Sequence, residues 1–510
     1  MTGRPPANLA ELLVSRAQRH PQHRFAVADA EVGHGQLATL GGTLEVGGRL
    51  AATLAELGLR AGTRVALIGP TSSAYLLWWA GLQLSGAEVA LVNPSYPAAL
   101  IAEILRPLAP EFVVWVHRDA ESGVASGARH IEGADVGDGT FVVDGDVASL
   151  GETPGDLPGL ARRPLDVAGW MHTSGTTGVP KLCTQSHEYF LRLGRFVADT
   201  LALSERDLVF APLPLFHINP LGYGVVGALV GHSEVVGWER FSARRFWPLV
   251  RDLAATSTIL HAPPVEILKQ TTTAGDAAGH HLRSVLYADP DFLEQFDIPL
   301  GLSVYGSTEV GGLSHTWSWR RGESSDVPEG AARYGGRARA DVRWTLADDG
   351  EILISSDRPG VLFSGYLSAA GVQPVISPDG WFHTGDLGRV DEFGNLVFLE
   401  RAAEAIRVKG EYVPIGYVEE RLRTVAGIDD LALWRRDNPL VDHDAVLYID
   451  APRIPADQLV AAAETLPRFM RPTVVLRVDG RLPRDAGVGK VRRRDLASLT
   501  VLEERELSYP

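Results

Sequence analysis

The 510-residue chain has a single cysteine, Cys183. One cysteine excludes a disulfide framework and a metal site built from several thiolates, and it agrees with a reducing compartment. The N-terminus lacks a continuous apolar run, so we expect no signal peptide. The most apolar stretch, residues 75–92, is interrupted by Gly86 and Glu88 and is too broken to span a bilayer. We therefore predict a cytoplasmic protein that has no membrane partner.

Positive charge is also scarce. The chain has 48 lysines and arginines against 63 acidic residues, which gives a formal net charge of −15. A nucleic-acid-binding protein needs a basic face, so we predict no nucleic-acid partner. This net charge is compatible with a locally basic pocket and with a homodimer. The hydrophobic content of 45% is ordinary for a globular protein of two or more domains.

Short apolar strands alternate with helical patterns through the first two thirds of the chain. Strands are predicted at 64–69 and 88–92, with a helix between them, and this alternation indicates βα units with buried parallel strands. After about residue 335, alternating segments such as 351–356 suggest antiparallel strands. A smaller unit begins at about residue 404, and the last residues, 503–510, are predicted to be a solvated tail. We expect an N-terminal domain over 1–400, a hinge at 401–403 and a C-terminal domain over 404–510.

The stretch "TSGTTGVPK" joins glycines and hydroxyl side chains to one lysine. Its spacing differs from that of a Walker A loop, but exposed backbone N–H groups, hydroxyls and an ammonium are the groups that cradle phosphate. A polar surface loop is the alternative interpretation. The candidate phosphate ligands are Thr173, Ser174, Gly175, Thr176, Thr177, Gly178 and Lys181.

Further motifs follow in a fixed order. They are "LSGAEVALVNP" from Leu84, "LPLFHINPLG" from Leu213, "VYGSTEVGG" from Val304, "GWFHTGDLGRV" from Gly380, "ERAAEAIRVKGEYVPIGYVEE" from Glu400 and "LPRDAGVGKVRRRDL" from Leu482. Together with the loop above, this set resembles the adenylate-forming superfamily, which contains acyl-CoA synthetases, luciferases and the adenylation domains of peptide synthetases. The resemblance covers nearly the whole chain, and within the superfamily the sequence is most like an acyl-CoA ligase. It implies an α/β fold: a large domain of βα units with helix-flanked sheets and a small β-barrel-like part, followed by a smaller, mobile α+β domain.

The resemblance also implies a reaction. A carboxylic acid is joined to ATP with the help of Mg²⁺, which gives an acyl-adenylate and pyrophosphate, and the thiol of coenzyme A then attacks the adenylate. Residues 173–181 match the loop that holds the β- and γ-phosphates. Thr308 and Glu309 match positions that contact the α-phosphate and Mg²⁺, and a carboxylate suits a hard cation.

Other matches concern the nucleoside. Tyr305 matches an adenine-stacking position, and Asp386 matches the carboxylate that accepts both ribose hydroxyls. Taken alone, Asp386 would be assigned to a solvated turn. The remaining nucleotide-binding candidates implied by the resemblance are Ala288, Asp289, Gly306 and Arg401.

The acyl and thiol sites are implied in the same way. His217 matches a gate near the acyl group, and Lys490 matches the lysine that bridges carboxylate and α-phosphate, although Lys490 also lies in an ordinary basic run. The small domain is expected to rotate after adenylation and to bring Lys409 and Gly410 to a thiol tunnel. A solvated β-turn is an equally good interpretation of that loop. The side chains near His217, Phe216 and Leu221, favour an apolar acid.

Four positions depart from the family pattern. Leu182 replaces the glycine after the loop lysine, Tyr287 and Glu400 stand where glycine is expected, and Ala403 occupies the hinge. A phenol at Tyr287 would fill the adenine slot, and a carboxylate at Glu400 would repel phosphate.

We therefore expect an AMP-forming acyl-CoA ligase, with three alternatives. The protein performs mainly the second half-reaction on an acyl-adenylate made elsewhere, or it loads a separate carrier protein, or it binds acyl groups and nucleotides without catalysis. A serine hydrolase is disfavoured because the chain has no G-x-S-x-G motif.

Overall fold

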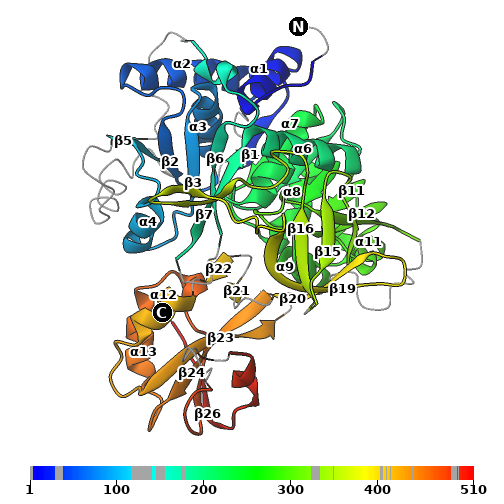
Figure 1. Ribbon diagram of the computed structural model, residues 1–510. Helices are drawn as coiled ribbons and strands as arrows, with labels where there is room; N and C mark the ends of the chain where they lie inside the picture. Colours follow the sequence, from blue (N-terminus) through cyan, green and yellow to red (C-terminus); the bar gives the residue numbers. More distant parts are fainter. Residues whose placement is uncertain are drawn as a thin grey trace. The chain divides into compact units, whose positions relative to one another are not determined.

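The computed structural model divides into two compact units (Figure 1). The first comprises Met1–Pro94, Ile101–His172 and Leu182–Glu400, and the second comprises Ser95–Leu100, Thr173–Lys181 and Arg401–Pro510. The residues that the structure describes are 4–28, 38–116, 141–144, 156–173, 179–322, 334–348, 350–401, 406–408, 411–413, 415–438, 440, 442–483, 491 and 493–509.

An eight-stranded sheet contains the predicted parallel strands. Its core is parallel because β2 pairs with both β3 and β4, and β3 pairs with β6. The helix α3 (Ser73–Leu84) joins β2 to β3, and the side chain of its N-cap Ser72 accepts a hydrogen bond from Tyr75. The expected strand–helix–strand order is therefore confirmed. In spatial order the strands are β18 (Gly371–Gln373), β17 (Gly365–Ser368), β7 (Lys181–Ser186), β6 (Val167–Thr173), β3 (Glu88–Val92), β2 (Arg64–Ile68), β4 (Phe112–Trp115) and β5 (Phe141–Asp144).

A twelve-stranded sheet carries most of the candidate site. In spatial order its strands pair in parallel from β1 to β12, and β13 pairs antiparallel with both β12 and β14. The change from parallel to antiparallel pairing therefore begins near residue 315, earlier than the sequence predicted. The order is β1 (Phe25–Ala28), β9 (Glu234–Trp238), β8 (Leu208–Ala211), β10 (Ser257–Ile259), β11 (Ser284–Leu286), β12 (Leu300–Tyr305), β13 (His315–Arg320), β14 (Tyr334–Ala338), β20 (Leu396–Arg401), β19 (Phe382–Val390), β16 (Glu351–Ser355) and β15 (Arg343–Leu346).

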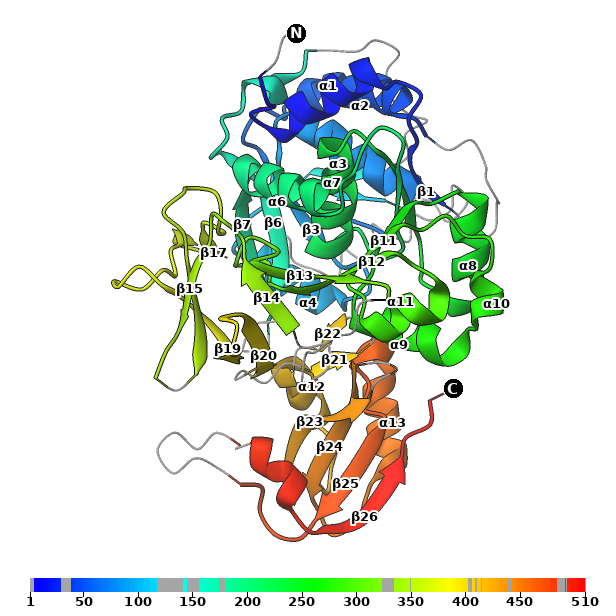
Figure 2. The same ribbon diagram turned by 90° about the vertical axis from the view of Figure 1, so that its right-hand side faces the viewer.

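Helices cover these sheets and supply the core. Leu193 of α6 and Leu221 of the π-helix η3 are both fully buried in the largest hydrophobic cluster. The helices α6 and α7 run close together in both views (Figure 2). The helices named above span His187–Thr200 (α6), Asn219–Val226 (η3) and Gly227–Val230 (α7). Further α-helices of this unit are α1 (Leu9–Arg19), α2 (Leu40–Glu56), α8 (Ala243–Asp252), α9 (Ala262–Thr271), α10 (Ala274–Ala277) and α11 (Pro290–Phe296). Helix α4 (Ala98–Leu105) lies partly in the first unit and partly in the second.

The second unit is an α+β unit, as the sequence predicted. Val418 and Leu422 of α12 (Ile415–Leu422) are fully buried, and β25 spans Val474–Val478. Its sheet has the order β22 (Glu411–Val413), β21 (Ile406–Val408), β24 (Asp442–Asp450), β25 and β26 (Val501–Glu506); β23 (Asp430–Asn438) also pairs with β24, and α13 spans Ala456–Glu464.

The predicted solvated tail is wrong. Residues 503–506 belong to β26, which pairs antiparallel with β25, and the Tyr509 hydroxyl donates a 2.7 Å hydrogen bond to the Pro472 carbonyl. The strand lies at the sheet edge, and all six of its side chains are exposed. Without a buried face the strand has no apolar alternation, so its sequence looks like a tail.

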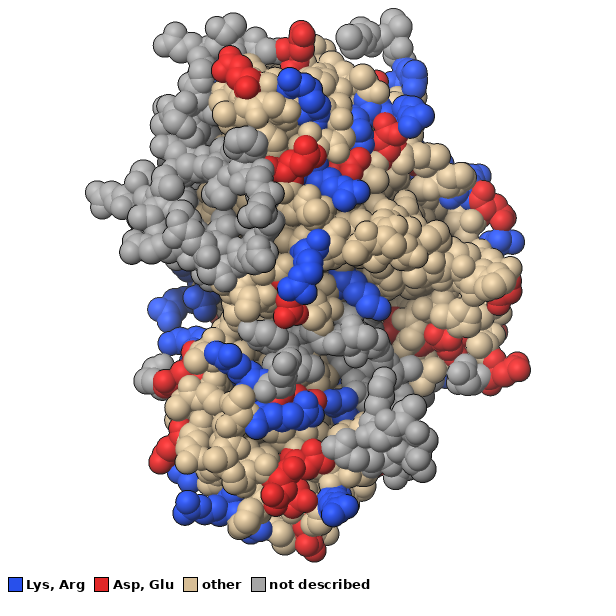
Figure 3. All heavy atoms as spheres, turned by 60° about the vertical axis from the view of Figure 1, so that its left-hand side comes forward, with Lys and Arg blue, Asp and Glu red and all other residues tan. Residues whose placement is uncertain are grey.

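Among the described residues no helix is long and apolar enough to cross a membrane. On the face drawn in Figure 3, lysine and arginine side chains lie beside aspartate and glutamate side chains, and neither sign covers the described surface alone.

Candidate active site

The turn between β12 and β13, residues 306–314, carries two of the predicted catalytic residues. It folds back on its own strand, because both the backbone N–H and the hydroxyl of Ser314 donate to the Tyr305 carbonyl, at 3.0 and 3.2 Å. A side chain at Gly306 is excluded, since a Cβ there would lie 1.9 Å from the Gly312 carbonyl oxygen. The turn therefore requires glycine at position 306 for steric reasons, independently of the predicted role of Gly306 in nucleotide binding.

Thr308 and Glu309 are held in this turn by two tyrosines. The hydroxyl of Tyr189, on α6, donates a 2.8 Å hydrogen bond to the Thr308 carbonyl. The hydroxyl of Tyr366, on β17, donates a 2.9 Å hydrogen bond to Oε1 of Glu309. Glu309 is only 6% exposed, and its carbonyl accepts from the N–H of Phe363 at 3.1 Å. The carboxylate is therefore fixed in both backbone and side chain.

A third tyrosine links the predicted adenine and ribose positions. The Tyr305 hydroxyl donates a 3.0 Å hydrogen bond to Oδ2 of Asp386, which lies on β19 and is 6% exposed. The Tyr305 ring also stacks against Phe398, with centroids 5.8 Å apart and an interplanar angle of 26°. The structure thus brings Tyr305 and Asp386 together from segments 81 residues apart.

The segment after β11 adjoins the same strand ends. β11 and β12 are parallel neighbours, and the carboxyl ends of such strands are where ligands bind in α/β sheets. Ala288 is buried, and its N–H donates to the Leu302 carbonyl at 3.1 Å. Asp289 caps α11 through the N–H of Phe292 and pairs with Lys269 at 2.9 Å. Its carboxylate is therefore engaged within the fold.

Tyr287 has a backbone φ of +68°. This left-handed conformation is rare for a bulky residue and free of strain only for glycine. The glycine that the family pattern predicts at this position thus has a conformational reason, in addition to the room it would leave for a flat ring. The tyrosine is half-buried and packs against both large hydrophobic clusters of the unit.

His217 lies in an aromatic cluster. Its ring centroid is 4.7 Å from that of Phe216 and 5.7 Å from that of His172. His172 is buried, and burial together with the nearby His217 lowers the pKa of His172 to about 3, so that ring is neutral at physiological pH. Leu221 follows on η3 and is fully buried in the hydrophobic core.

The predicted phosphate loop is described only at its ends. Thr173 is the last residue of β6, and Lys181 is the first residue of β7. Leu182, one of the departures, is buried in β7. Glu400 and Arg401 end β20. The remaining predicted residues lie outside the described part of the chain: Ser174, Gly175, Thr176, Thr177, Gly178, Ala403, Lys409, Gly410 and Lys490.

Comparison with known proteins now decides the family. Residues 13–367 match the model of the AMP-binding enzyme family. The chain belongs to this family. This membership confirms the predicted relation to the adenylate-forming superfamily. The expectation of an acid–thiol ligase is confirmed together with the relatives named below, which are CoA ligases.

Individual relatives and structures agree with the assignment. The chain is 28% identical over 404 residues to a crotonobetaine/carnitine–CoA ligase of Salmonella paratyphi A, covering 74% of this chain and 77% of the relative. A mutant o-succinylbenzoate CoA synthetase of Bacillus subtilis, bound to a product analogue, superposes with a TM-score of 0.79 over 98% of this chain and 99% of its own, at 21% identity. A Mycobacterium tuberculosis fatty acyl CoA synthetase gives 0.65 at 22% identity, over 96% and 98% of the two chains. These superpositions confirm the predicted fold.

The residues of this AMP-binding enzyme fit Mg²⁺ better than a metal that needs several protein ligands. Among the residues with described positions, no group of three or more histidine, cysteine or acidic side chains could hold a metal. Mg²⁺ is usually bound through one or two carboxylates, with water and substrate phosphates completing its shell. A single buried carboxylate, Glu309, suits that pattern.

Sequence reasoning missed Tyr189 and Tyr366, which hold the turn. Tyr366 is 57 residues from Glu309, and Tyr189 is 119 residues from Thr308. No periodicity or spacing in the sequence links positions so far apart, so only the folded chain reveals these contacts.

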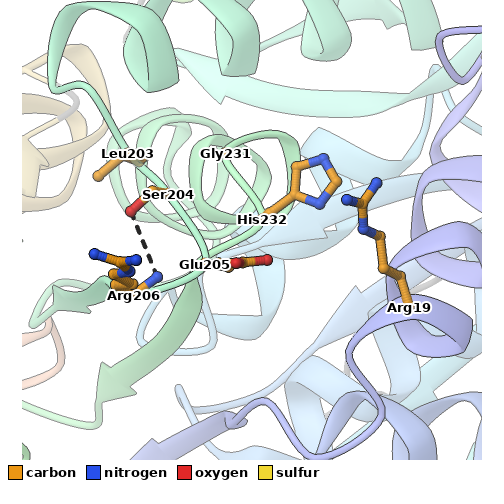
Figure 4. A pocket seen from close by; sticks show the side chains of 7 residues that line it. All are labelled: Arg19, Leu203, Ser204, Glu205, Arg206, Gly231 and His232. Carbon is orange, nitrogen blue, oxygen red and sulfur yellow. Dashed lines mark hydrogen bonds between the residues drawn. The ribbon is translucent and has the colours of Figure 1, made fainter.

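A pocket of about 500 Å³ lies elsewhere on the enzyme, at the end of α1 and in the loops after α6 and α7 (Figure 4). The Ser204 hydroxyl donates to Asp207, and burial lowers the pKa of His232 to about 4. None of the described lining residues is a predicted site residue. They are Arg19, Leu203, Ser204, Glu205, Arg206, Gly231 and His232.

Proposed function

We propose that this AMP-binding enzyme is an acyl-CoA ligase that joins an apolar carboxylic acid to coenzyme A, with ATP and Mg²⁺, by way of an acyl-adenylate. The observation that carries the proposal is the pair of tyrosine–carboxylate hydrogen bonds at the end of β12. Tyr305 fixes Asp386, and Tyr366 fixes Glu309. Two preorganised carboxylates suit a ribose and a hard cation respectively.

The proposed roles follow from the chemistry of each group. The Asp386 carboxylate accepts hydrogen bonds from ribose hydroxyls, and the Tyr305 ring packs against the base. Glu309 holds Mg²⁺, which supplies charge neutralisation for the phosphates when bound. Thr308 donates its hydroxyl proton to an α-phosphate oxygen. Lys490 balances the charge of the acid and the α-phosphate while the oxygen–phosphorus bond forms.

The remaining predicted residues complete the proposed site. Residues 173–181 bind the β- and γ-phosphates, and Arg401 lies beside the ribose. His217, within its aromatic cluster, gates the acyl group next to the buried Leu221. Lys409 and Gly410 lie on the loop that admits the thiol, in a C-terminal domain over 404–510 that rotates about 401–403.

The test is a thioester assay with ATP, coenzyme A and a panel of carboxylic acids. Short acids belong on the panel because a relative is named a crotonobetaine/carnitine–CoA ligase, and medium and long apolar acids belong there because of Leu221. Substituting phosphopantetheinyl carrier proteins for coenzyme A separates the ligase from an enzyme that loads a carrier. Failure of both acceptors with every acid would overturn the proposal.

A second candidate function is supported by Tyr287. A side chain stands where the pattern has glycine, in a left-handed conformation that only glycine adopts without strain. This observation favours weak ATP binding and an enzyme that mainly passes acyl groups from a supplied adenylate to coenzyme A. Slow acid-dependent ATP–pyrophosphate exchange, beside rapid thioester formation from synthetic adenylate, would distinguish it.

A further inference from the structure

A buried arginine, Arg339, lies behind the turn that carries Thr308 and Glu309. It follows β14 directly and is only 4% exposed. Its Nη1 donates to two carbonyls of the turn, Gly311 at 3.1 Å and Leu313 at 2.9 Å. Both of these residues are buried. The Gly311 carbonyl also accepts from the N–H of Leu313 at 3.0 Å. A buried carbonyl without a donor is costly, so the guanidinium satisfies the Leu313 carbonyl and adds a second donor to the Gly311 carbonyl.

The guanidinium is itself held on its other edge. Nε and Nη2 donate to the two carboxylate oxygens of Asp341, each at 3.0 Å. Its Cζ also lies 5.1 Å from the ring centroid of Phe196, on α6. A fork bonded in this way to a carboxylate has a fixed orientation, which a flexible lysine could not reproduce.

Backbone contacts tie the same two segments together. The N–H of Arg339 donates to the Ser314 carbonyl at 2.8 Å. Gly311 has a φ of +78°, and a Cβ there would lie 3.3 Å from Nη1 and 2.6 Å from the Val361 carbonyl. The turn therefore comes as close to the guanidinium as its glycine allows, and a displaced arginine would leave the turn without its support.

We infer that Arg339, oriented by Asp341, is a positioning residue for the proposed reaction: it fixes the turn that presents Thr308 and Glu309. The inference rests on the proposed function for its kinetic consequence only. The hydrogen bonds described for its side chain go to turn carbonyls and to Asp341, so we assign it an indirect effect, through the turn.

The chain contains a matched control in Arg283. Its Nε donates to Asp207, and its other nitrogens donate to the Leu201 and Ala202 carbonyls at 2.7 and 3.0 Å. Arg283 thus combines a carboxylate and two carbonyls as Arg339 does, but on a loop that carries no predicted site residue. Arg339→Met and Arg283→Met remove comparable contacts from different places.

The experiment compares these variants by hydrogen exchange and by kinetics. In Arg339→Met, amides of the turn such as those of Val310, Gly312 and Ser314 should exchange at least about tenfold faster. The kcat of acyl-CoA formation should fall on the order of 30- to 100-fold, with a smaller change in the KM for the acid. Arg339→Lys should recover part of kcat. Arg283→Met should leave the turn's exchange and kcat unchanged.

The outcomes separate the inference from the proposed function. Absence of thioester formation by the wild-type enzyme would overturn the function, while the exchange rates of the turn would still decide whether Arg339 holds it. Unchanged exchange in Arg339→Met, or faster exchange with unchanged kcat, would overturn the inference. An equal loss of kcat in Arg283→Met would also overturn it, because a general loss of stability would then explain the effect.

Discussion

The Tyr366 hydroxyl donates a 2.9 Å hydrogen bond to Oε1 of the buried Glu309. Glu309 is the residue to which the account assigns Mg²⁺, and Tyr366 determines the direction in which its carboxylate points. A neutral donor of this kind fixes a carboxylate without cancelling the charge that a cation needs.

Tyr366→Phe removes only that donor. A hydrogen bond to a charged group contributes about 1.5–3 kcal/mol, so kcat/KM for acyl-CoA formation should fall roughly 10- to 100-fold. The Mg²⁺ concentration for half-maximal rate should rise. Tyr334→Phe is the matched control, because the Tyr334 hydroxyl donates to Asp391 outside the proposed site. An equal loss of kcat/KM in both variants would refute a specific role for Tyr366.

Tyr287→Gly should improve nucleotide binding. Glycine relieves a left-handed backbone that costs about 1–3 kcal/mol in a bulky residue, and it opens the proposed adenine slot. We expect the KM for ATP to fall severalfold, measured by ATP–pyrophosphate exchange. Loss of the packed ring opposes the gain in stability, so the KM is the decisive quantity. An unchanged or higher KM would contradict the assignment of this position to the adenine slot.

Lys490→Ala should separate the two half-reactions. If Lys490 acts only while the acyl-adenylate forms, acid-dependent pyrophosphate release should fall by about 100-fold or more. Thioester formation from synthetic adenylate should be nearly unaffected. Equal losses in both reactions would contradict this role for the lysine.

Stability should fall with acid because of buried histidines. His187 begins α6, and burial together with Arg162 lowers its pKa to about 4. The unfolded chain has the higher pKa, near 6.5, so it binds the proton first, and stability is lost as pH falls from about 6.5 toward 4. At pH 5, one such group lowers the free energy of unfolding by about 2 kcal/mol relative to its value at neutral pH.

His187→Gln tests this linkage. The difference in unfolding free energy between pH 7.5 and pH 5, measured with urea, should shrink by about 2 kcal/mol in the variant. The same difference in both proteins would show that His187 does not contribute. The variant also loses the ring nitrogen Nδ1 that accepts from the N–H of Leu9 at 3.4 Å, so a modest loss of stability is expected at both pH values.

The sequence was sufficient to predict those secondary-structure elements whose burial leaves an apolar pattern. The runs at β2 and β3 are apolar because parallel strands are covered on both faces, so they were predictable. β26 was missed because an exposed edge strand has no such pattern.

The candidate site, too, could be predicted from the sequence only in part. Motif resemblance reached Tyr305, Glu309 and Asp386, which carry the proposed chemistry. It did not reach Tyr366 or Arg339, because their effect depends on contacts between segments distant in the chain. The resemblance also marked Tyr287 as unusual, but only the backbone showed the positive φ that glycine would accommodate.

The central claim is that this enzyme makes acyl-CoA from a free acid, ATP and coenzyme A. The most direct measurement is mass-spectrometric detection of acyl-CoA together with quantification of AMP across the acid panel. We predict that at least one apolar acid gives acyl-CoA and AMP in equal amounts, and that Glu309→Gln abolishes both products. Absence of acyl-CoA with every acid, or its formation without AMP, would contradict the account.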